Sequence, residues 1–539
     1  MYDVISEADI AEVRDRISTL PHSALISIVM PVYNTPEKWL RLAIESVRNQ
    51  IYENWELCIA DDNSTDPAIR QILEEYASSD DRIRLVFRSE NGHISAASNS
   101  ALDLASGEFT VLFDHDDELA PYALAELVFE IHRSPGANMI YSDEDMISET
   151  GRRYMPKFKP DWSLDLFYSM NLVTHLVAYR TRLIKEVGGF REGFEGSQDY
   201  DLALRVVKKI EPNTIRHIPR ILYHWRAVKG SAASGLEGKP YAYARAREAI
   251  SEHFQRIGTN AYSIEAPLQI NRTVYRIPEP ITAVSLILSG RIDPVDLPKA
   301  LVAVDYPRAV ELIVATNDEL GERVLSENVR VCYSGRGDHF SLLNDGAASA
   351  RGEVLCFIDP TSEPVGTDWL KVLVGYAIQE EIGAVGAKLI YPDNTIKHAG
   401  YVMGIRNGIG RPHYRFRSDS YGDYMRLVVD QNVSATSSDC MVIRRSVFDE
   451  IGGFNVSDYP NSLADIDLCL RLRRAGYRIV WTPWAQMIQS REDDRRSEKE
   501  LEKLRRNWPD IFAGDPFYNP NLTLEKEDLS PAFPPRPVR

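Results

Sequence analysis

Apolar-rich runs alternate with amphipathic stretches along the first half of this chain. Four such runs predict buried strands, at 25–34, 55–66, 83–89 and 110–113. Apolar residues recur every three or four positions in four other stretches and predict helices, at 7–19, 36–50, 67–77 and 93–105. We expect the first strand to break at Pro31, because proline cannot donate a ladder hydrogen bond. The alternation of strand and helix predicts a parallel sheet covered by helices on both faces.

Polar residues follow three of the predicted strands directly. The segments are "PVYN" (31–34), "DDNSTD" (61–66) and "DHDD" (114–117). In parallel sheets of this kind ligands bind at the carboxyl ends of the strands. The three segments therefore predict one binding site at that edge.

The second half of the chain repeats motifs of the first in the same order. The matched pairs are "GEFTVLFDHDDEL" with "GEVLCFIDPTSEP", "EVGGF" with "EIGGF", and "QDYDLALRV" with "ADIDLCLRL". This pattern indicates a tandem duplication joined within "YRIPEPITA". We expect a helical extension at 1–24, an active domain at 25–275, a second, degenerate domain at 281–512 and a tail at 513–539.

Composition excludes several classes of protein. The 539 residues are 44% hydrophobic and 26% charged, as in globular proteins, and the net charge of −17 argues against nucleic acid or anionic membrane as a general partner. The five cysteines form no CxxC pair, which favours reduced thiols and a cytoplasmic setting. We see no signal peptide and no apolar run near the ~20 residues of a membrane span.

The acids of "DHDD" suit a hard divalent cation. Mg²⁺ takes one or two carboxylates and completes its shell with substrate phosphates, and Asp114 and Asp116 end one strand together. The competing interpretation is a solvated acidic turn. The other strand-end motifs favour a site for Mn²⁺ or Mg²⁺.

The series "SIVMPVYN", "IADDNSTD", "FDHDD" and "GSQDYDLALR" resembles the inverting glycosyltransferases of family 2, which have the GT-A fold. Longer blocks, such as "ENGHISAASNSAL" and "KPDWSLDLFYSMNLVTHLVAYR", resemble its bacterial surface-polysaccharide, O-antigen branch. The likeness covers about 25–235 closely and 284–490 more loosely. It implies an α/β fold of two tandem GT-A-like, Rossmann-like domains with mainly parallel sheets.

The resemblance also implies roles for individual residues. Asp116 would be the likelier direct metal ligand, with His224 approaching the metal or diphosphate, and Asp199 would be the catalytic base. The family more often has Glu-Asp where this chain has Gln198 before Asp199. The donor would contact Pro31, Val32, Tyr33, Asn34, Asp61 or Asp62, Ser95, Asn99, Asp114 and His115.

Structural interpretations compete with two of these roles. Asp199 could cap the helix that begins "YDLALRVV", and His224 could be a hydrogen-bonded core histidine. If Asp199 is not the base, the acids of "YSDEDMI" are the alternatives, namely Asp143, Glu144 and Asp145.

The second copy has lost several of these residues. Asp359 matches Asp114, but Thr361 replaces Asp116. Ser362 replaces Asp117, and Ile488, Gln489 and Ser490 stand where relatives commonly carry histidine. We therefore expect the second domain to be a degenerate transferase that serves structure, acceptor binding or partner contact.

Together these observations predict a metal-dependent, inverting transfer of a hexose or deoxyhexose from a UDP-, dTDP- or GDP-sugar. The acceptor would be a growing surface polysaccharide or lipid-linked glycan, handled in the cytoplasm or at the inner face of the membrane beside other assembly enzymes. The alternatives are a bifunctional transferase with two active domains and a non-catalytic glycan-binding scaffold. A sugar nucleotidyltransferase is disfavoured, because "PVYNTPEKW" lacks the glycine-rich loop that it needs. Neither the sugar, the base nor the acceptor is encoded in these motifs.

Overall fold

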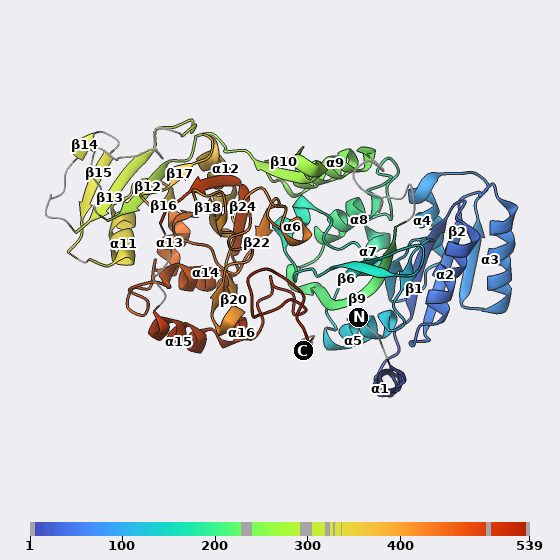
Figure 1. The fold of residues 1–539 in the computed structure, drawn as a ribbon. Helices are drawn as coiled ribbons and strands as arrows, with labels where there is room; N and C mark the ends of the chain where they lie inside the picture. Colours follow the sequence, from blue (N-terminus) through green and yellow to red (C-terminus); the bar gives the residue numbers. More distant parts are fainter. Residues whose placement is uncertain are drawn as a thin grey trace. The chain divides into compact units, whose positions relative to one another are not determined.

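The computed structural model describes residues 6–227, 240–290, 304–317, 324–326, 329–335, 337–491 and 497–534. The chain divides into two compact units (Figure 1). Unit 1 comprises residues 1–162 and 170–271, and unit 2 comprises 163–169 and 272–537. Within the described ranges, no helix is both long and apolar enough to cross a bilayer.

Unit 1 is built on one sheet with the strand order β3-β2-β1-β4-β8-β6-β9-β5, with β7 paired to β6. The four strands from β3 to β4 are parallel, whereas β8 and β5 run antiparallel to their neighbours. The strands are β1 (Ile26–Val32), β2 (Trp55–Asp61), β3 (Ile83–Phe87), β4 (Phe109–Leu112), β5 (Glu118–Leu119), β6 (Met139–Ile147), β7 (Arg153–Lys157), β8 (Val177–Arg180) and β9 (Ile215–Arg226). The helices are α1 (Glu7–Ser18), α2 (Glu37–Arg48), α3 (Pro67–Ser79), α4 (His93–Leu104), α5 (Ala123–Arg133), α7 (Thr181–Glu186), α8 (Gln198–Val207) and α9 (Pro240–Ile257).

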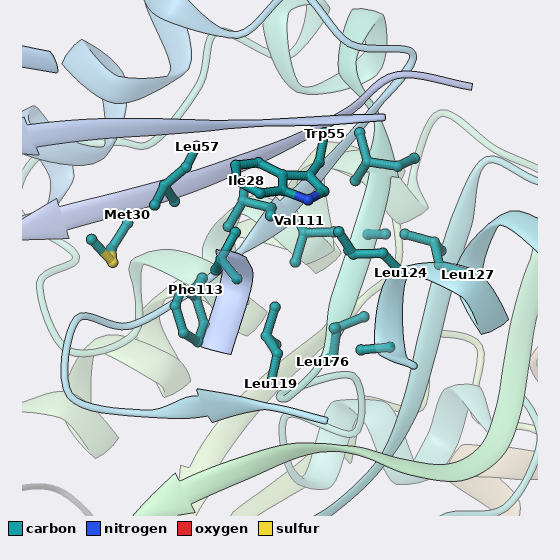
Figure 2. Close-up of a cluster of buried hydrophobic side chains, with 14 of the residues drawn as sticks. Ile28, Met30, Trp55, Leu57, Val111, Phe113, Leu119, Leu124, Leu127 and Leu176 are labelled. Atoms are coloured by element: carbon teal, nitrogen blue, oxygen red, sulfur yellow. The ribbon is translucent and has the colours of Figure 1, made fainter. Parts of the chain in front are cut away.

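Helices cover both faces of this sheet. Ile28 and Met30 lie on one face of β1 and belong to a core that includes residues of α2, α3 and α5. Figure 2 shows them with Leu124 and Leu127 of α5. Helix α4 packs against β1 and β2, and its buried residues Ala97 and Ala101 lie outside that core. The near-continuous apolar runs of the parallel strands follow from this burial on both sides.

The first strand does not break at Pro31, so this expectation is wrong. β1 continues to Val32, with Pro31 paired to Ala60 of β2. On its other side, the pairing of β1 with β4 ends at Val29 and Leu112. Proline is tolerated at this position because the neighbouring strand has already left the ladder.

Unit 2 has a sheet of the order β14-β15-β13-β12-β16-β23-β18-β24-β17, with β19 and β22 at its side. Its strands are β12 (Val284–Ser289), β13 (Glu311–Thr316), β14 (Val324–Ser326), β15 (Val329–Tyr333), β16 (Val354–Ile358), β17 (Glu363–Pro364), β18 (Ile382–Ile390), β19 (Ile396–His398), β22 (Gln431–Asn432), β23 (Cys440–Arg444) and β24 (Arg478–Ile488). Its helices are α6 (Leu164–Ser169), α11 (His339–Ser349), α12 (Trp369–Ala377), α13 (Arg445–Ile451), α14 (Ala464–Arg474), α15 (Glu498–Asn507) and α16 (Pro509–Ala513). A separate hairpin pairs β20 (Val402–Met403) with β21 (Ile409–Gly410).

The strand orders of the two units match position by position. β3-β2-β1-β4-β8-β6-β9-β5 corresponds to β15-β13-β12-β16-β23-β18-β24-β17. The predicted fold class, two tandem α/β domains with mainly parallel, Rossmann-like sheets, is confirmed.

Equivalent side chains brace the two copies in the same way. Asn99 exchanges two hydrogen bonds with the backbone of Phe190, and Asn344 does the same with Phe454. A Cβ on Gly189 would lie 2.4 Å from Asn99 Oδ1, at a φ of +68°, so only glycine fits there. The "GGF" turns recur because this bracket requires them.

The division into units differs from the predicted domains in two places. Residues 163–169 belong to unit 2, where the buried Asp165 forms an ion pair with Arg478 at 3.0 Å. Residues 514–534 also belong to unit 2, with Leu522 and Leu529 buried. The closing segment "RPVR" with the proline before it lies outside the described residues.

Candidate active site

The three polar segments leave neighbouring strands at one edge of the sheet of unit 1. Val32 at the end of β1 pairs with Asp61 at the end of β2. Beyond β4, the backbone N–H of Phe113 donates to the carbonyl of Val29 on β1 at 3.1 Å. Parallel strands therefore deliver the segments 31–34, 61–66 and 114–117 side by side, as the sequence predicts.

The loop after β1 has one exposed aromatic ring. Pro31 and Val32 are buried in the strand, whereas Tyr33 is 44% exposed. Asn34 has a φ of +46°, and its Oδ1 accepts from the backbone N–H of Thr65 at 2.9 Å. Asn34 thus ties the loops after β1 and β2 together, and Tyr33 supplies the exposed aromatic ring of this loop.

The two acids after β2 have different surroundings. Asp62 Oδ1 accepts from Arg88 Nε at 2.7 Å and from the backbone N–H of Gly92 at 3.0 Å, so it braces α4. Asp61 Oδ2 accepts from the N–H of Ser64 at 3.2 Å, while its buried Oδ1 has no hydrogen-bond partner in the described protein. A buried carboxylate oxygen without a partner is costly. Asp61 is therefore the better candidate to bind a ligand N–H.

Helix α4 carries the two predicted donor residues Ser95 and Asn99. Ser95 is fully buried. The Asn99 amide donates to the carbonyl of Phe190 at 2.8 Å and accepts from its N–H at 2.8 Å. Both polar atoms of Asn99 are thus used within the fold, which supports a structural role.

The loop of Asp114 to Asp117 is fastened to β9. Buried Asp117 accepts from the hydroxyl of Tyr223 and from the backbone N–H of Arg226, each at 2.6 Å. Arg226 Nε also donates to the carbonyl of Asp116 at 2.7 Å. Burial and the nearby charges of Asp116 and Asp114 raise the pKa of Asp117 well above its usual value. Asp117 therefore holds the loop, and Asp116, 24% exposed, remains accessible.

His115 and His224 lie beside this loop. His115, 29% exposed, places Nδ1 3.8 Å from Asp116 Oδ1. His224 pairs across the ladder with Glu118, directly after the acidic loop, and its Nδ1 bonds Asp145 Oδ1 at 2.6 Å. A carboxylate on Nδ1 selects the tautomer whose Nε2 carries the lone pair, which is the arrangement of metal-binding histidines.

These residues suit a metal whose coordination shell is completed by the bound substrate. Among the described residues, no three His, Cys, Asp or Glu side chains form a ready-made metal cluster. Mg²⁺ and Mn²⁺ do not require one, because substrate phosphates fill part of their shell. Asp114, Asp116 and His224 offer oxygen and imidazole donors of the right kind.

Asp199 lies in the first turn of α8, but it is not the helix cap. The cap position is Ser197. Asp199 Oδ2 accepts from Asn171 Nδ2 at 2.8 Å and from Thr174 Oγ1 at 3.0 Å. Burial raises the pKa of Asp199, although hydrogen bonds from Thr174, from backbone N–H groups and from Asn171 oppose that rise. A carboxyl with a raised pKa can act as a general base.

The three acids of "YSDEDMI" are all engaged inside the protein. Burial alone would raise the pKa of Glu144, but the charges of Lys157 and Lys159 outweigh it and lower that pKa to about 2. The closest ionisable partners are His217 for Asp143 (2.9 Å), Lys157 for Glu144 (2.6 Å) and His224 for Asp145 (2.6 Å). None of the three acids therefore matches the surroundings of Asp199.

Asn171, Thr174 and Lys159 are not among the site residues predicted from the sequence. All three lie in the block "KPDWSLDLFYSMNLVTHLVAYR", which begins at Lys159 and which supported the predictions only as a part of the family resemblance. Lys159 is fully buried and donates to the backbone carbonyls of Thr174 and His175 at 2.6 and 2.8 Å. Isolated polar residues in a buried stretch were the available signal.

The corresponding edge of unit 2 has a different chemistry. Glu363 pairs with Ile488 as Glu118 pairs with His224, so an apolar side chain occupies the histidine position. Asp359 Oδ1 accepts from the backbone N–H of Thr361 at 2.8 Å, and its Oδ2 lies 3.2 Å from Arg491 Nη1.

A family model described as "Glycosyl transferase family 2" matches residues 27–188 and 312–452, more than half of the chain. Both units contribute to the match.

Three curated relatives show the range of similarity. The chain is 41% identical over 538 residues to the uncharacterized protein y4gI of Sinorhizobium fredii, covering 95% of this chain and 59% of that protein. It is 33% identical over 546 residues to the O-antigen biosynthesis protein RfbC of Myxococcus xanthus, covering 97% of this chain and 42% of RfbC. It is 33% identical over 215 residues to the putative colanic acid biosynthesis glycosyl transferase WcaA of Escherichia coli, covering 38% of this chain and 74% of WcaA. The chain thus spans about half the length of the first two relatives.

Proposed function

The chain belongs to glycosyl transferase family 2, and we propose that unit 1 is a metal-dependent, inverting glycosyltransferase acting in surface-polysaccharide synthesis. One observation carries this proposal. The acidic loop is bonded to β9 through Asp117 and Arg226, directly beside His224. Both segments that the resemblance assigns to the metal are therefore held together at one strand-end site.

Donor binding would use the loops after β1 and β2. The unpartnered Oδ1 of Asp61 supports its role as acceptor for an N–H of the base, and the exposed ring of Tyr33 supports a contact with the nucleoside. Asp62, Asn34 and Asn99 would support these loops from within the fold. Pro31, Val32, Ser95, Asp114 and His115 remain proposed neighbours of the donor.

Asp116, with Asp114 and His224, would hold Mn²⁺ or Mg²⁺. When bound, the cation would neutralise the diphosphate and stabilise it as a leaving group. The Asp145 carboxylate would keep His224 in the metal-binding tautomer, and Asp117 would fix the loop without itself facing the ligand.

Asp199 would accept the proton of the acceptor hydroxyl as that oxygen attacks the anomeric carbon. Inversion follows from a single displacement of the nucleoside diphosphate. The raised pKa of Asp199 supports this role, because a carboxylate with a higher pKa binds a proton more tightly than an ordinary one. Asp143, Glu144 and Asp145 are supported less, since each already has a close cationic or imidazole partner.

The names of RfbC and WcaA support a lipid-linked or growing surface polysaccharide as the acceptor. A cytoplasmic location, with peripheral contact at the inner membrane, belongs to the same proposal. Unit 2 would be a degenerate copy that binds acceptor or partner, because Ile488 and Thr361 occupy the metal-ligand positions.

The deciding experiment incubates the purified chain with UDP-, dTDP- and GDP-sugars, with and without Mn²⁺, and measures release of the nucleoside diphosphate. We expect hydrolysis of one donor that depends on the cation and is lost in Asp116→Asn. Absence of turnover for every donor, together with absence of nucleotide binding by calorimetry, would favour the glycan-binding scaffold.

A further inference from the structure

A short segment between β7 and β8 presents two donors to one oxygen of Asp199. Asn171 Nδ2 and Thr174 Oγ1 both lie within 3.0 Å of Asp199 Oδ2. Two donors on one oxygen restrict the rotation of a carboxylate, and they stabilise its charged form. They therefore act on both the geometry and the protonation of this group.

The backbone of this segment is in turn held by a buried ion pair. Lys159 Nζ donates to the carbonyls of Thr174 at 2.6 Å and His175 at 2.8 Å. Glu144 Oε2 accepts from the N–H of His175 at 2.5 Å and lies 3.5 Å from Lys159 Nζ. Lys159 has no exposed side-chain surface, and burial lowers its pKa. Burying both charges is expensive, which points to a specific task.

Unit 2 provides a comparison within the same chain. Arg180 ends β8 as Arg444 ends β23, so Thr174 corresponds to Ser438 and Asn171 to Ala435. Ser438 Oγ still donates to Asp465, the counterpart of Asp199, at 3.3 Å. The amide donor is absent from that position.

Glu144 also has no acidic counterpart in unit 2. The pairing of β6 with β8 and of β18 with β23 places Leu389 at the position of Glu144. By contrast, the bracket of Asn99 is kept by Asn344. The bracket and the hydroxyl donor are thus found in both copies, whereas the amide of Asn171 and the acid Glu144 are found in the copy proposed to catalyse.

We propose that Asn171 and Thr174 are positioning residues for the Asp199 base, and that Lys159 and Glu144 fix the segment that carries them. This inference rests on the proposed function, because it requires Asp199 to take the proton. The two donors orient the carboxylate towards the acceptor hydroxyl and keep it ionised in a partly buried place. Tyr179 on β8 also interacts with Asp199, but burial raises the pKa of this phenol, so it stays protonated.

The test compares Thr174→Val with Thr174→Ser, which keeps the hydroxyl, and uses the donor identified by nucleotide release. A hydrogen bond to a charged group is worth roughly 10- to 100-fold in rate when it acts in the transition state. We expect Thr174→Val to lower kcat by about 10-fold with little change in the KM for donor. The acid limb of its kcat profile should move to higher pH, because the carboxylate has lost a donor. Thr174→Ser should restore both.

Asn171→Ala is the second variant and should shift kcat and the acid limb in the same direction. It keeps the test decisive if circular dichroism shows that Thr174→Val does not fold. Ser438→Ala is the matched control, because it removes the equivalent hydroxyl in unit 2 and should change neither quantity. Wild-type kcat and an unmoved acid limb in folded Thr174→Val or Asn171→Ala would overturn the inference. Asp199→Asn separates the two levels: if it retains turnover, the assignment of the base fails, whereas if it is inactive while Thr174→Val and Asn171→Ala are normal, only the positioning role fails.

Discussion

Arg491 Nη1 lies 3.2 Å from Asp359 Oδ2 in unit 2, so a guanidinium faces the carboxylate that corresponds to Asp114. The other oxygen of Asp359 accepts from the backbone N–H of Thr361 at 2.8 Å. Both oxygens of this carboxylate are therefore used inside the protein. A cation that is part of the chain takes up the charge that a metal would neutralise in unit 1.

This arrangement predicts one strong Mn²⁺ site per chain in the presence of a nucleoside diphosphate. Calorimetry with UDP, dTDP and GDP should give a stoichiometry of one for the wild type and for Asp359→Asn. The site should be lost in Asp116→Asn. A stoichiometry of two in the wild type would contradict the view that Arg491 has replaced the metal.

The Asp116→Asn variant should lose metal-dependent donor binding while keeping its fold. An amide is close to a carboxylate in shape but supplies no charge, and Asp116 is partly exposed, so the substitution buries nothing new. Thermal unfolding should be nearly unchanged, whereas nucleotide affinity in Mn²⁺ should fall. Asp117→Asn is the informative comparison, because loss of the buried partner of Tyr223 and Arg226 should lower stability as well.

Substitutions of the adjacent acids Asp61 and Asp62 should have different effects on nucleotide binding and on stability. Asp61→Asn replaces a carboxylate whose buried Oδ1 has no hydrogen-bond partner among the described residues, so it should weaken nucleotide binding without loss of stability. Asp62→Asn breaks the pair with Arg88 and should lower the free energy of unfolding by about 1–3 kcal/mol. Chemical denaturation and calorimetry on both variants check this. If Asp62→Asn proves stable and Asp61→Asn unstable, the two roles are reversed.

These positions also show which features of the site can be predicted from the sequence. Strand-end chemistry, the duplication and the second copy's losses are readable, because strand period and motif order are local properties of the chain. The choice between Asp61 and Asp62 is not, since it depends on Arg88 and Gly92, which lie beyond the next strand. Asn171 and Thr174 escaped for the same reason, because their partner Asp199 is more than twenty residues away.

Asp199→Asn should cost roughly 10²–10⁴ in kcat, the usual contribution of a positioned base, with donor affinity nearly unchanged. The wild-type rate should rise with pH through the pKa of Asp199, because only the ionised carboxylate accepts a proton. Since burial raises that pKa, the acid limb should lie above the range of an ordinary aspartate. A profile that is flat down to pH 4 would place the base elsewhere.

The last prediction is that all transfer comes from unit 1. In unit 2, Thr361 and Ile488 stand where unit 1 has the proposed metal ligands Asp116 and His224, and Arg491 pairs with Asp359. A neighbour such as Glu363 could compensate for one of these losses. Metal binding in unit 2 would, however, need replacements for both the acid and the histidine. The retained Asp465 does not restore the site, because an acid in the first turn of a helix is stabilising without catalysis.

Two double variants decide between one active unit and two. Asp116→Asn with Asp199→Asn should abolish transfer from the true donor, whereas Asp359→Asn with Asp465→Asn should leave the rate unchanged. Circular dichroism guards against unfolding, since Asp465 accepts from the backbone N–H of Ser438. The result that overturns the prediction is residual transfer in the first double variant that disappears when the second pair is added. Such a result would require unit 2 to bind a donor through groups other than those matched to unit 1, and the chain would then be a bifunctional transferase.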